Sequence, residues 1–293
     1  MNIDAWLGEA KKQIDALDAE IIALVGLSDI LSSEIDRSFL CAHAEMEIPQ
    51  RSLQKINQML ERRAAGEPLA YIIGEREFFG RMFRVNESVL IPRVDTEALI
   101  YLVQDLDLPG RPRFLEIGTG SGCIAVTLAL EYPQAEVLAT DISKKALEVA
   151  ELNDVIHEGR IDLVESDLLE NIDPEMDGNF DVLIANLPYV NPDWEWLDLA
   201  ALQYEPQNAL FAEEGGLALY YRLLQQLQEK IAAHNLMHHA EQDSTKLCHG
   251  EPWIKYLVFE ADPCQHDDLV SLAEAYGWQL DIIEGYGLRF KVK

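Results

Sequence analysis

Apolar residues recur at helical spacing through the first 66 residues of the chain. They come every three or four positions, first at Ile3, Trp6, Leu7, Ile14, Leu17, Ile21, Ile22 and Leu24, and later at Leu53, Ile56, Met59 and Leu60. This period places apolar side chains on one face of successive helices, and a glycine, Gly66, follows the last set as it often follows a helix. The pattern predicts a small helical domain over residues 1–68.

The pattern changes between residues 69 and 94. Short apolar runs are broken by glycine, as in Tyr71-Ile72-Ile73-Gly74, in Phe78-Phe79-Gly80 and near Phe83-Arg84-Val85. Runs of this kind are typical of short strands joined by tight turns. We expect a β-hairpin linker over residues 69–94.

From residue 95 to residue 293, helical patterns alternate with short apolar strands. Such alternation is typical of an α/β fold, in which a parallel sheet has helices on both faces. A chain of 293 residues also exceeds the usual size of a single domain, so residues 95–293 are expected to form the larger of two. The predicted strands are residues 113–117, 136–140, 161–164, 180–185 and 256–261, followed by an antiparallel pair at 278–283 and 288–292.

The charge of the chain argues against a free nucleic acid as its substrate. The formal net charge is −29, from 52 acidic and 23 basic residues. A field of this sign repels phosphate backbones and anionic membrane surfaces. Residues 51–93 are an exception, because they contain three more basic than acidic residues. This stretch either meets an acidic partner or consists of solvated helix faces.

The four cysteines indicate a reducing setting. Cys41, Cys123, Cys248 and Cys264 show no paired spacing, and the first residues lack the basic and then apolar pattern of an export signal. No charge-free stretch is long enough to span a bilayer. We therefore expect a soluble, cytoplasmic protein.

Residues 234–253 are polar and rich in histidine, without a clear period. This segment predicts a long loop or an extension of a helix. His234 and His238 have the spacing of two zinc ligands on one helix face, but no closed ligand set accompanies them. We expect no metal site.

A glycine loop follows the strand that ends at Ile117. Its residues are Gly118, Thr119, Gly120, Ser121 and Gly122, and Cys123 stands where the strict dinucleotide fingerprint has its third glycine. Glycines let the backbone turn tightly and approach a ligand, and the next helix offers its N-terminal N–H groups. Asp141 lies 21 residues after Gly120, where a carboxylate can accept hydrogen bonds from a ribose diol. The spacing occurs with both NAD and S-adenosylmethionine, so it predicts a nucleoside ligand only.

Asp167 and Leu168 follow the third predicted strand of the sheet. Asp167 could accept a hydrogen bond from an adenine amino group, and Leu168 could pack on the adenine ring. An N-cap of a helix explains Asp167 about as well.

The tetrapeptide Asn186-Leu187-Pro188-Tyr189 follows the strand at residues 180–185, at the edge of the sheet where open α/β folds bind ligands. A carboxamide oxygen and a backbone carbonyl can each accept a hydrogen bond, and an aromatic ring can cover a flat amino group. The tetrapeptide therefore favours an amide or aromatic amine as acceptor. Alone, it could also be a turn.

These segments together resemble the HemK/PrmC-type methyltransferases, which modify a glutamine side-chain nitrogen in peptide chain release factors. The resemblance covers nearly the whole chain. It includes residues 66–74, 89–97 and 205–210 in addition to the glycine loop and the tetrapeptide. It implies a seven-stranded, Rossmann-like domain that uses S-adenosylmethionine, a β-hairpin linker, and an N-terminal helical domain that helps to dock the release factor.

The resemblance also implies roles for single residues. The loop from Gly118 to Gly122, together with Asp141, Leu168 and Asn186, would contact S-adenosylmethionine. Residues 186–189 would hold the acceptor glutamine. Pro92 and Arg93 would line the entrance, although Arg93 could instead form a structural ion pair. The chain departs from the family at Leu187, where a proline is usual.

The expected reaction is methyl transfer to the N5 nitrogen of a glutamine, by positioning and without a strong general base. Alternatives are an N6-adenine methyltransferase acting on RNA or DNA, and a glutamine methyltransferase acting on a ribosomal protein. A module that binds the donor without turnover belongs to a different class. An NAD dehydrogenase fits worst, because the tetrapeptide would have no role. We expect a monomer.

Overall fold

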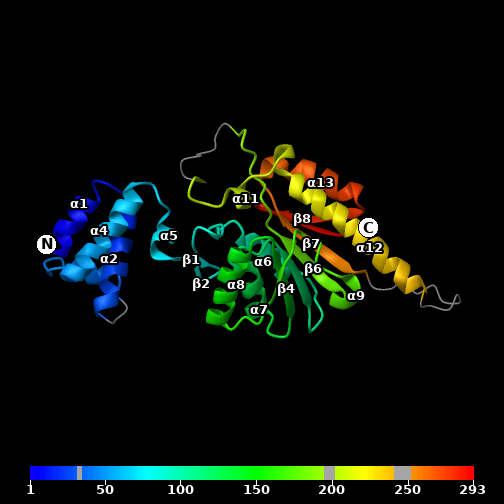
Figure 1. Cartoon of the computed structure of the whole chain (residues 1–293), viewed down its shortest axis with the longest axis horizontal. Helices are drawn as coiled ribbons and strands as arrows, with labels where there is room; N and C mark the ends of the chain where they lie inside the picture. The colour runs from blue at the N-terminus through cyan, green and yellow to red at the C-terminus, as the bar shows by residue number, and fades with distance from the viewer. Residues whose placement is uncertain (32–34, 195–201, 241–251) are drawn as a thin grey trace. The chain divides into compact units, whose positions relative to one another are not determined.

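The computed structural model describes residues 1–31, 35–194, 202–240 and 252–293. The chain divides into two compact units, which are described separately below (Figure 1). The first comprises Met1–Glu75 and Asp198–Tyr204, and the second comprises Arg76–Leu197 and Glu205–Lys293.

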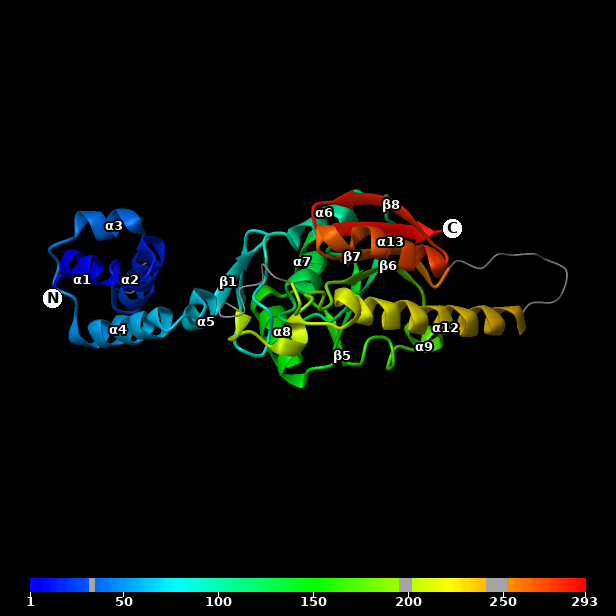
Figure 2. The same cartoon turned by 90° about the horizontal axis from the view of Figure 1, so that it is seen from above.

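The first unit is helical, as predicted. Its helices are α1 (Ile3–Ala10), α2 (Ala16–Leu31), α3 (Arg37–Ala42), α4 (Gln50–Ala64) and α5 (Leu69–Ile73), and Figure 2 shows the first four grouped together. Ile3, Trp6, Ile22 and Ile56 are buried in one common core. A Cβ atom at Gly26 would lie 2.1 Å from Cγ2 of Ile56, so glycine is required where α2 meets α4.

The hairpin predicted for residues 69–94 is shorter than expected, and the prediction was wrong for its first part. Leu69–Ile73 form a helix that ends at Gly74, whose φ is +82°. The two strands are β1 (Glu75–Phe78) and β2 (Arg81–Arg84). Both turn residues between them, Phe79 and Gly80, have positive φ, as in the tight turns that match the twist of a hairpin.

The second unit contains a seven-stranded sheet. The strands are β3 (Arg113–Ile117), β4 (Glu136–Asp141), β5 (Asp162–Glu165), β6 (Phe180–Ala185), β7 (Ile254–Glu260), β8 (Trp278–Glu284) and β9 (Gly287–Val292). Their order is β5-β4-β3-β6-β7-β9-β8, and β9 is antiparallel to both of its neighbours while the other pairs are parallel. The chain builds one half of the sheet outward from β3 and the other outward from β6. A crevice therefore opens at the carboxyl ends of β3 and β6, where the strand order reverses.

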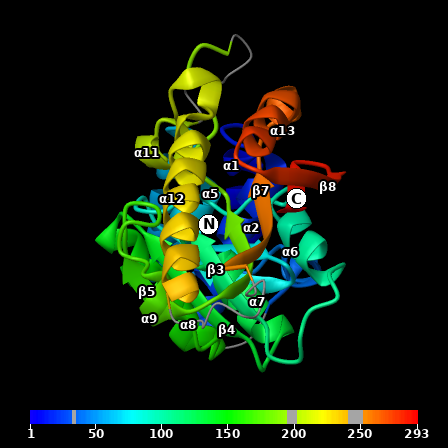
Figure 3. The same ribbon diagram turned by 90° about the vertical axis from the view of Figure 1, so that its right-hand side faces the viewer.

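Helices cover both faces of this sheet, and the predicted α/β fold is confirmed. Alternate strand residues serve the two faces, as Phe114 and Leu115 do. One face packs against α12 (Ala218–Ala240) and α13 (His266–Ala275), and the other against α6 (Glu97–Gln104) and α7 (Cys123–Glu131), with α8 (Lys144–His157) beside α7 (Figure 3). Short helices complete the unit: α9 (Pro174–Asp177), α11 (Gln207–Leu210) and the 3₁₀ turns Glu214–Gly216 and Pro263–Gln265.

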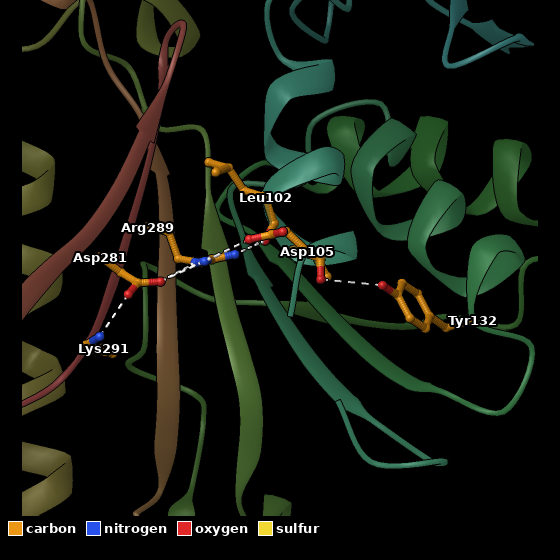
Figure 4. Close-up of polar contacts among 7 residues, drawn as sticks. Leu102, Asp105, Tyr132, Asp281, Arg289 and Lys291 are labelled. Atoms are coloured by element: carbon orange, nitrogen blue, oxygen red, sulfur yellow. Dashed lines mark hydrogen bonds and ion pairs between the residues drawn. The ribbon is translucent and has the colours of Figure 1, made fainter. Parts of the chain in front are cut away.

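Arg289 fixes α6 against the antiparallel end of the sheet. Its guanidinium pairs with Asp281 on β8 at 2.7 Å, pairs with Asp105 at 3.0 Å and donates to the carbonyl of Leu102 at 2.8 Å (Figure 4). Leu102 belongs to the last turn of α6, whose carbonyls lack partners within the helix. The contact holds this end of α6, and the other end presents Thr96 to the crevice.

The helix α12 extends into the histidine-rich segment as far as Ala240, so a helix extension is present there, and residues 241–251 lie outside the described part. Within the described ranges, no helix is both long and apolar enough to cross a membrane.

Candidate active site

A cavity of about 500 Å³ lies at the carboxyl ends of the central strands. It is lined by the glycine loop after β3, by the turns after β4 and β5, by the tetrapeptide after β6 and by residues 206–213. This volume is typical of pockets for small molecules and cofactors. The crevice predicted from the strand order is thus a formed site.

The structure brings most of the predicted site residues to this cavity. Those in its lining are Pro92, Arg93, Gly118, Thr119, Gly120, Ser121, Asp141, Asp167, Leu168, Asn186, Leu187 and Pro188. Gly122 and Tyr189 were also predicted, but they are not among the lining residues.

The glycine loop has a backbone that other residues would adopt with strain. Gly118, Gly120 and Gly122 all have positive φ, between 55° and 79°. A Cβ atom at Gly122 would also lie 3.0 Å from Cβ of Ala150 on α8. At Gly120, in contrast, a Cβ atom would meet nothing within 4 Å, because this residue faces the open cavity. The backbone can therefore approach a ligand closely at Gly120.

A buried carboxylate fastens the loop to the helix that follows it. Glu116 on β3 is 1% exposed, and its Oε2 accepts hydrogen bonds from Thr119 Oγ1 at 2.6 Å and from the N–H of Ala125 at 3.1 Å. Ala125 belongs to the first turn of α7, where backbone N–H groups lack helical partners. Burial raises the pKa of Glu116 to about 7, against the effect of these two hydrogen bonds.

Asp141 ties the glycine loop to the next loop of the sheet edge. Its Oδ2 accepts from the N–H of Gly120 at 2.9 Å, and its Oδ1 accepts from the N–H of Ser143 at 2.8 Å. Burial raises the pKa of Asp141, and these backbone donors oppose the rise. Each carboxylate oxygen has a second lone pair, so both can still accept from a diol in the cavity.

Asp167 is held by a cation. The guanidinium of Arg222, on α12, donates to Asp167 Oδ2 at 2.8 Å, and both residues line the cavity. No helix begins at Asp167, so the N-cap alternative was wrong. Next to it, Leu168 is buried and has a φ of +54°, an uncommon backbone conformation for a residue with a side chain. The strained backbone presents Leu168 to the cavity.

Side chains hold the first half of the tetrapeptide. Nδ2 of Asn186 donates to Oγ1 of Thr96 at 3.2 Å, and the N–H of Leu187 donates to Oη of Tyr220 at 3.2 Å. A proline at position 187 could not make the second bond, because it has no N–H. The leucine side chain is buried in the core beneath the cavity, 3.1 Å from the position of a Cβ atom at Gly118. In this chain, both the backbone N–H and the side chain of Leu187 therefore make contacts that fix the tetrapeptide.

The second half of the tetrapeptide is also fixed. Oη of Tyr189 donates to Oε1 of Glu260 at 3.0 Å, and the carbonyl of Tyr189 accepts from Nε2 of Gln265 at 2.8 Å. A Cβ atom at Gly216 would lie 2.0 Å from the same carbonyl, so only glycine fits there. Downstream, Val190 pairs with Phe211 in a parallel bridge. The segment after residue 205 therefore positions the tetrapeptide.

Arg93 forms a structural ion pair, which was the alternative hypothesis for this residue. Its guanidinium binds Glu205, which is buried and also accepts from the N–H of Ile91 at 3.1 Å. Arg93 still lines the cavity, as does Pro92. The pair joins two of the segments on which the family resemblance depends.

The buried polar residues near the cavity that were not anticipated from the sequence include Thr96, Glu116, Tyr220 and Glu260. Glu116 and Glu260 carried a usable signal, because each is an acid within or at the end of an otherwise apolar strand. Thr96 and Tyr220 carried none, since their partners are distant in the chain. The described residues contain no group of three possible metal ligands, and His249 of the segment 234–253 lies outside them.

The chain is similar to known proteins along most of its length. The model of the methyltransferase small domain matches residues 92–241, and the model of the PrmC N-terminal domain matches residues 5–74. The release factor glutamine methyltransferase of Koribacter versatilis is 38% identical over 235 residues, which are 79% of this chain and 83% of that protein.

A bifunctional methyltransferase of Rickettsia bellii is 37% identical over 227 residues, which are 67% of this chain but only 40% of that longer protein. A solved structure, a methyltransferase from Pyrococcus furiosus, matches 80% of this chain and 98% of its own chain at 16% identity, with a TM-score of 0.49.

The features of the cavity fit a nucleoside donor: an open approach at Gly120, acceptor capacity at Asp141 and an apolar wall at Leu168. Because the methyltransferase model also covers this region, S-adenosylmethionine is the cofactor. From the two family models and the extent of the similarity to curated relatives, the chain belongs to the release factor glutamine methyltransferase family.

Proposed function

We propose that this chain transfers a methyl group from S-adenosylmethionine to the side-chain amide nitrogen of a glutamine in a peptide chain release factor. One observation carries the proposal. Asn186 lines the cavity, and its Nδ2 is engaged by Thr96, so that its Oδ1 remains to accept a hydrogen bond from the substrate. Proteins of this family from several bacteria are named for that reaction, which supports the choice of substrate.

The chemistry requires positioning of a weak nucleophile. An amide nitrogen attacks poorly, because its lone pair is delocalised into the carbonyl. In our proposal Asn186 Oδ1 and the carbonyl of Leu187 accept the two N–H bonds of the glutamine amide, and so direct its lone pair into the cavity. The bound donor supplies an electrophilic methyl group on a sulfonium. The nitrogen gains this methyl group and loses one proton to solvent, without a strong base before attack.

The other predicted site residues divide between the two reactants. We assign Gly118–Gly122 to the amino-acid part of the donor, Asp141 to its ribose, and Asp167 with Leu168 to its adenine. The Asp167 oxygen that is not bound by Arg222 is the one that would accept from the adenine amino group. Pro188 and Tyr189 complete the acceptor side, and Pro92 with Arg93 forms its rim.

We assign the docking of the release factor to the N-terminal helices. The basic excess of residues 51–93 supports this, because it would complement an acidic surface in an otherwise acidic chain. The domain limits expected from the sequence, at residues 68 and 94, remain predictions, and the first compact unit of the structure extends to Glu75. A monomeric state, a cytoplasmic location and the absence of nucleic-acid partners also remain predictions.

The test is a labelling experiment with three candidate acceptors. The full chain is incubated with methyl-labelled S-adenosylmethionine and, separately, with release factor, ribosomal protein or RNA, and the product is mapped by mass spectrometry. We expect label on one release-factor glutamine. Label confined to RNA or to a ribosomal protein would overturn the assignment.

A further inference from the structure

The acceptor half of the site is the tetrapeptide, residues 186–189. Glu260 is a buried acid beside this half, and the proposed reaction does not use it. It is the last residue of β7, which neighbours β6, and the tetrapeptide follows β6. Its side chain is 1% exposed, although an ionised carboxylate is costly to bury. We therefore expect a buried acid either to have hydrogen-bond partners for both carboxylate oxygens or to take part in the function of the site.

The pairing of Glu260 is incomplete. Oε1 accepts the hydroxyl of Tyr189 at 3.0 Å, and the backbone carbonyl accepts the hydroxyl of Tyr220, which in turn holds the N–H of Leu187. The second carboxylate oxygen, Oε2, is buried and has no hydrogen-bond partner within the residues that the structure describes. Both ends of the tetrapeptide thus converge on Glu260, which has acceptor capacity to spare.

Thr96 and Asn186 complete the group around the carboxyl. Thr96 is 2% exposed and accepts from Nδ2 of Asn186. Both side chains lie near the Glu260 carboxyl, without a formed hydrogen bond to it, and oppose the rise of its pKa. An ionised carboxylate can only accept hydrogen bonds, whereas a threonine hydroxyl has a single proton. When that proton is directed to Glu260, Thr96 offers Asn186 only lone pairs.

This arrangement decides which end of the Asn186 carboxamide faces the cavity. With acceptors on the buried side, the amide group must turn Nδ2 inward and Oδ1 toward the substrate. The opposite orientation would present a donor to the donor groups of the glutamine amide and would leave the buried acceptors unsatisfied. The orientation of Asn186 therefore depends on an acceptor-only group behind it.

We propose that Glu260 is a positioning residue: as a carboxylate, it orients Asn186 through Thr96 and fixes Tyr189 directly, and so sets the acceptor site for an amide –NH2 group. This inference rests on the proposed function, because it assigns Asn186 Oδ1 to the substrate. Glu260 itself does not touch the reacting atoms.

The inference implies a pH dependence. Two titratable groups act on the pKa of Glu260: Asp95 before α6 and Tyr189 after β6. The charge of Glu260 in turn raises the pKa of Cys123 on α7, of Tyr220 on α12 and of Tyr286 in the final hairpin. Burial is the main cause that raises the pKa of Glu260, to about 7, with a contribution from the charge of Asp95. Because the ionised form is the positioning form, turnover should fall as the pH decreases through this value.

The experiment compares Glu260→Gln with wild type at saturating donor. Glutamine keeps the size of the side chain but adds a donor next to Asn186 and Thr96. We expect kcat on the release factor to fall about 10- to 100-fold, as misplaced positioning groups do. The donor half of the site, which is Gly118–Gly122 with Asp141, Asp167 and Leu168, is unchanged in this variant. The dissociation constant of S-adenosylhomocysteine should therefore stay within about twofold of the wild-type value. The acid limb of the kcat profile near pH 7 should disappear.

Two variants serve as matched controls. Asp181→Asn alters another buried acid, at the opposite end of β6, where it accepts from Arg113 and Lys255. It should leave kcat and its acid limb unchanged. Glu116→Gln removes the other carboxyl with a pKa of about 7, and it should retain the acid limb in kcat, because Glu116 contacts the glycine loop.

Thr96 provides a second route if Glu260→Gln does not fold. Thr96→Val removes the hydroxyl and keeps the shape, whereas Thr96→Ser keeps the hydroxyl. We expect Thr96→Val to lower kcat as much as Glu260→Gln does. Thr96→Ser should keep kcat close to the wild-type value. In the donor-free wild type, the side-chain amide NMR signal of Asn186 should shift with pH near 7, and in Thr96→Val this shift should be smaller.

The outcomes separate this inference from the proposed function. If the wild type labels no release factor, the proposed function fails. If the wild type labels it, and Glu260→Gln and Thr96→Val both retain wild-type kcat and acid limb, only the role of Glu260 is overturned.

Discussion

Two buried glutamates flank the strand that carries the tetrapeptide, and they differ in how they are satisfied. Glu116 on β3 and Glu260 on β7 lie on either side of β6, both are 1% exposed, and burial raises the pKa of each to about 7. Glu116 accepts from Thr119 and from a backbone N–H of α7. Glu260 keeps one buried oxygen without a partner in the described part of the chain.

The difference shows that the two halves of the site are built differently. In the donor half, backbone N–H groups donate most of the hydrogen bonds: those of Gly118 and Thr119 to a backbone carbonyl, and those of Gly120 and Ser143 to Asp141. The acceptor half is held by side chains that come from the N-cap of α6, from α12 and from β7. A backbone cradle suits a cofactor of constant shape, whereas a side-chain network can impose the orientation of one carboxamide.

The largest effect is expected from a substitution that disrupts the donor half and leaves the acceptor half intact. Asp141→Ala removes the acceptor of the Gly120 N–H and the proposed acceptor of the ribose diol. We expect the dissociation constant of S-adenosylhomocysteine to rise about 100-fold or more, because hydrogen bonds to a charged group contribute about 1.5–3 kcal/mol each. Calorimetric titration measures it. A change in the KM of the release factor with donor affinity intact would contradict the division into halves.

The pH dependence of stability tests whether both glutamates are buried in the manner described. A folded-state pKa of about 7, against 4.5 in the unfolded chain, means that the folded chain binds more protons between these values. The free energy of unfolding should therefore decrease as the pH rises from about 4.5 to 7, by on the order of 2–3 kcal/mol for each carboxyl. Urea unfolding at several pH values measures this. Glu116→Gln and Glu260→Gln should each make the free energy of unfolding less dependent on pH. An unchanged pH dependence in both variants would contradict a raised pKa for these glutamates.

Tyr220 tests the acceptor half at the point where the chain departs from its family. Tyr220→Phe leaves the N–H of Leu187 without its partner, so the free energy of unfolding should fall by about 1–2 kcal/mol. In the background Leu187→Pro, which has no N–H, the same substitution should cost less. Equal costs in the two backgrounds would show that the Leu187 bond contributes nothing.

The smallest effect is expected when the charge of Glu116 is removed and its shape retained. In Glu116→Gln, the side-chain oxygen can still accept from Thr119 and Ala125. We expect a roughly threefold to tenfold weaker binding of S-adenosylhomocysteine, from a less rigid glycine loop. Together with Glu260→Gln, which should spare donor binding, this variant gives a direct contrast between the two glutamates. Similar profiles for both variants would erase the contrast.

Periodicity predicted the sheet well, because strands buried on both faces are continuous apolar runs, as in Phe180–Ala185. It failed at Leu69–Ile73, where Tyr71, Ile72 and Ile73 favour a strand but pack as a short helix, with Ile72 buried in the core of the first unit. Tertiary packing overrides local propensity there.

The first contacts of the site were also predictable, because motifs such as the glycine loop and the tetrapeptide are local. Their support was not. Tyr220 lies 33 residues from Leu187, and Thr96 lies 90 residues from Asn186, so only the fold brings them together. The incomplete pairing of Glu260 could not be predicted from sequence, because it depends on which side chains surround one oxygen atom.

In our proposal, Asn186 accepts hydrogen bonds from the glutamine amide at the acceptor half of the cavity. The most direct measurement compares wild type and Asn186→Ala for methyl transfer to the release factor and for donor binding. We predict a loss of about 100- to 1,000-fold in kcat, as for the removal of one polar contact to a reacting group, with S-adenosylhomocysteine bound within a few fold of wild type. Retention of kcat by Asn186→Ala would contradict the account.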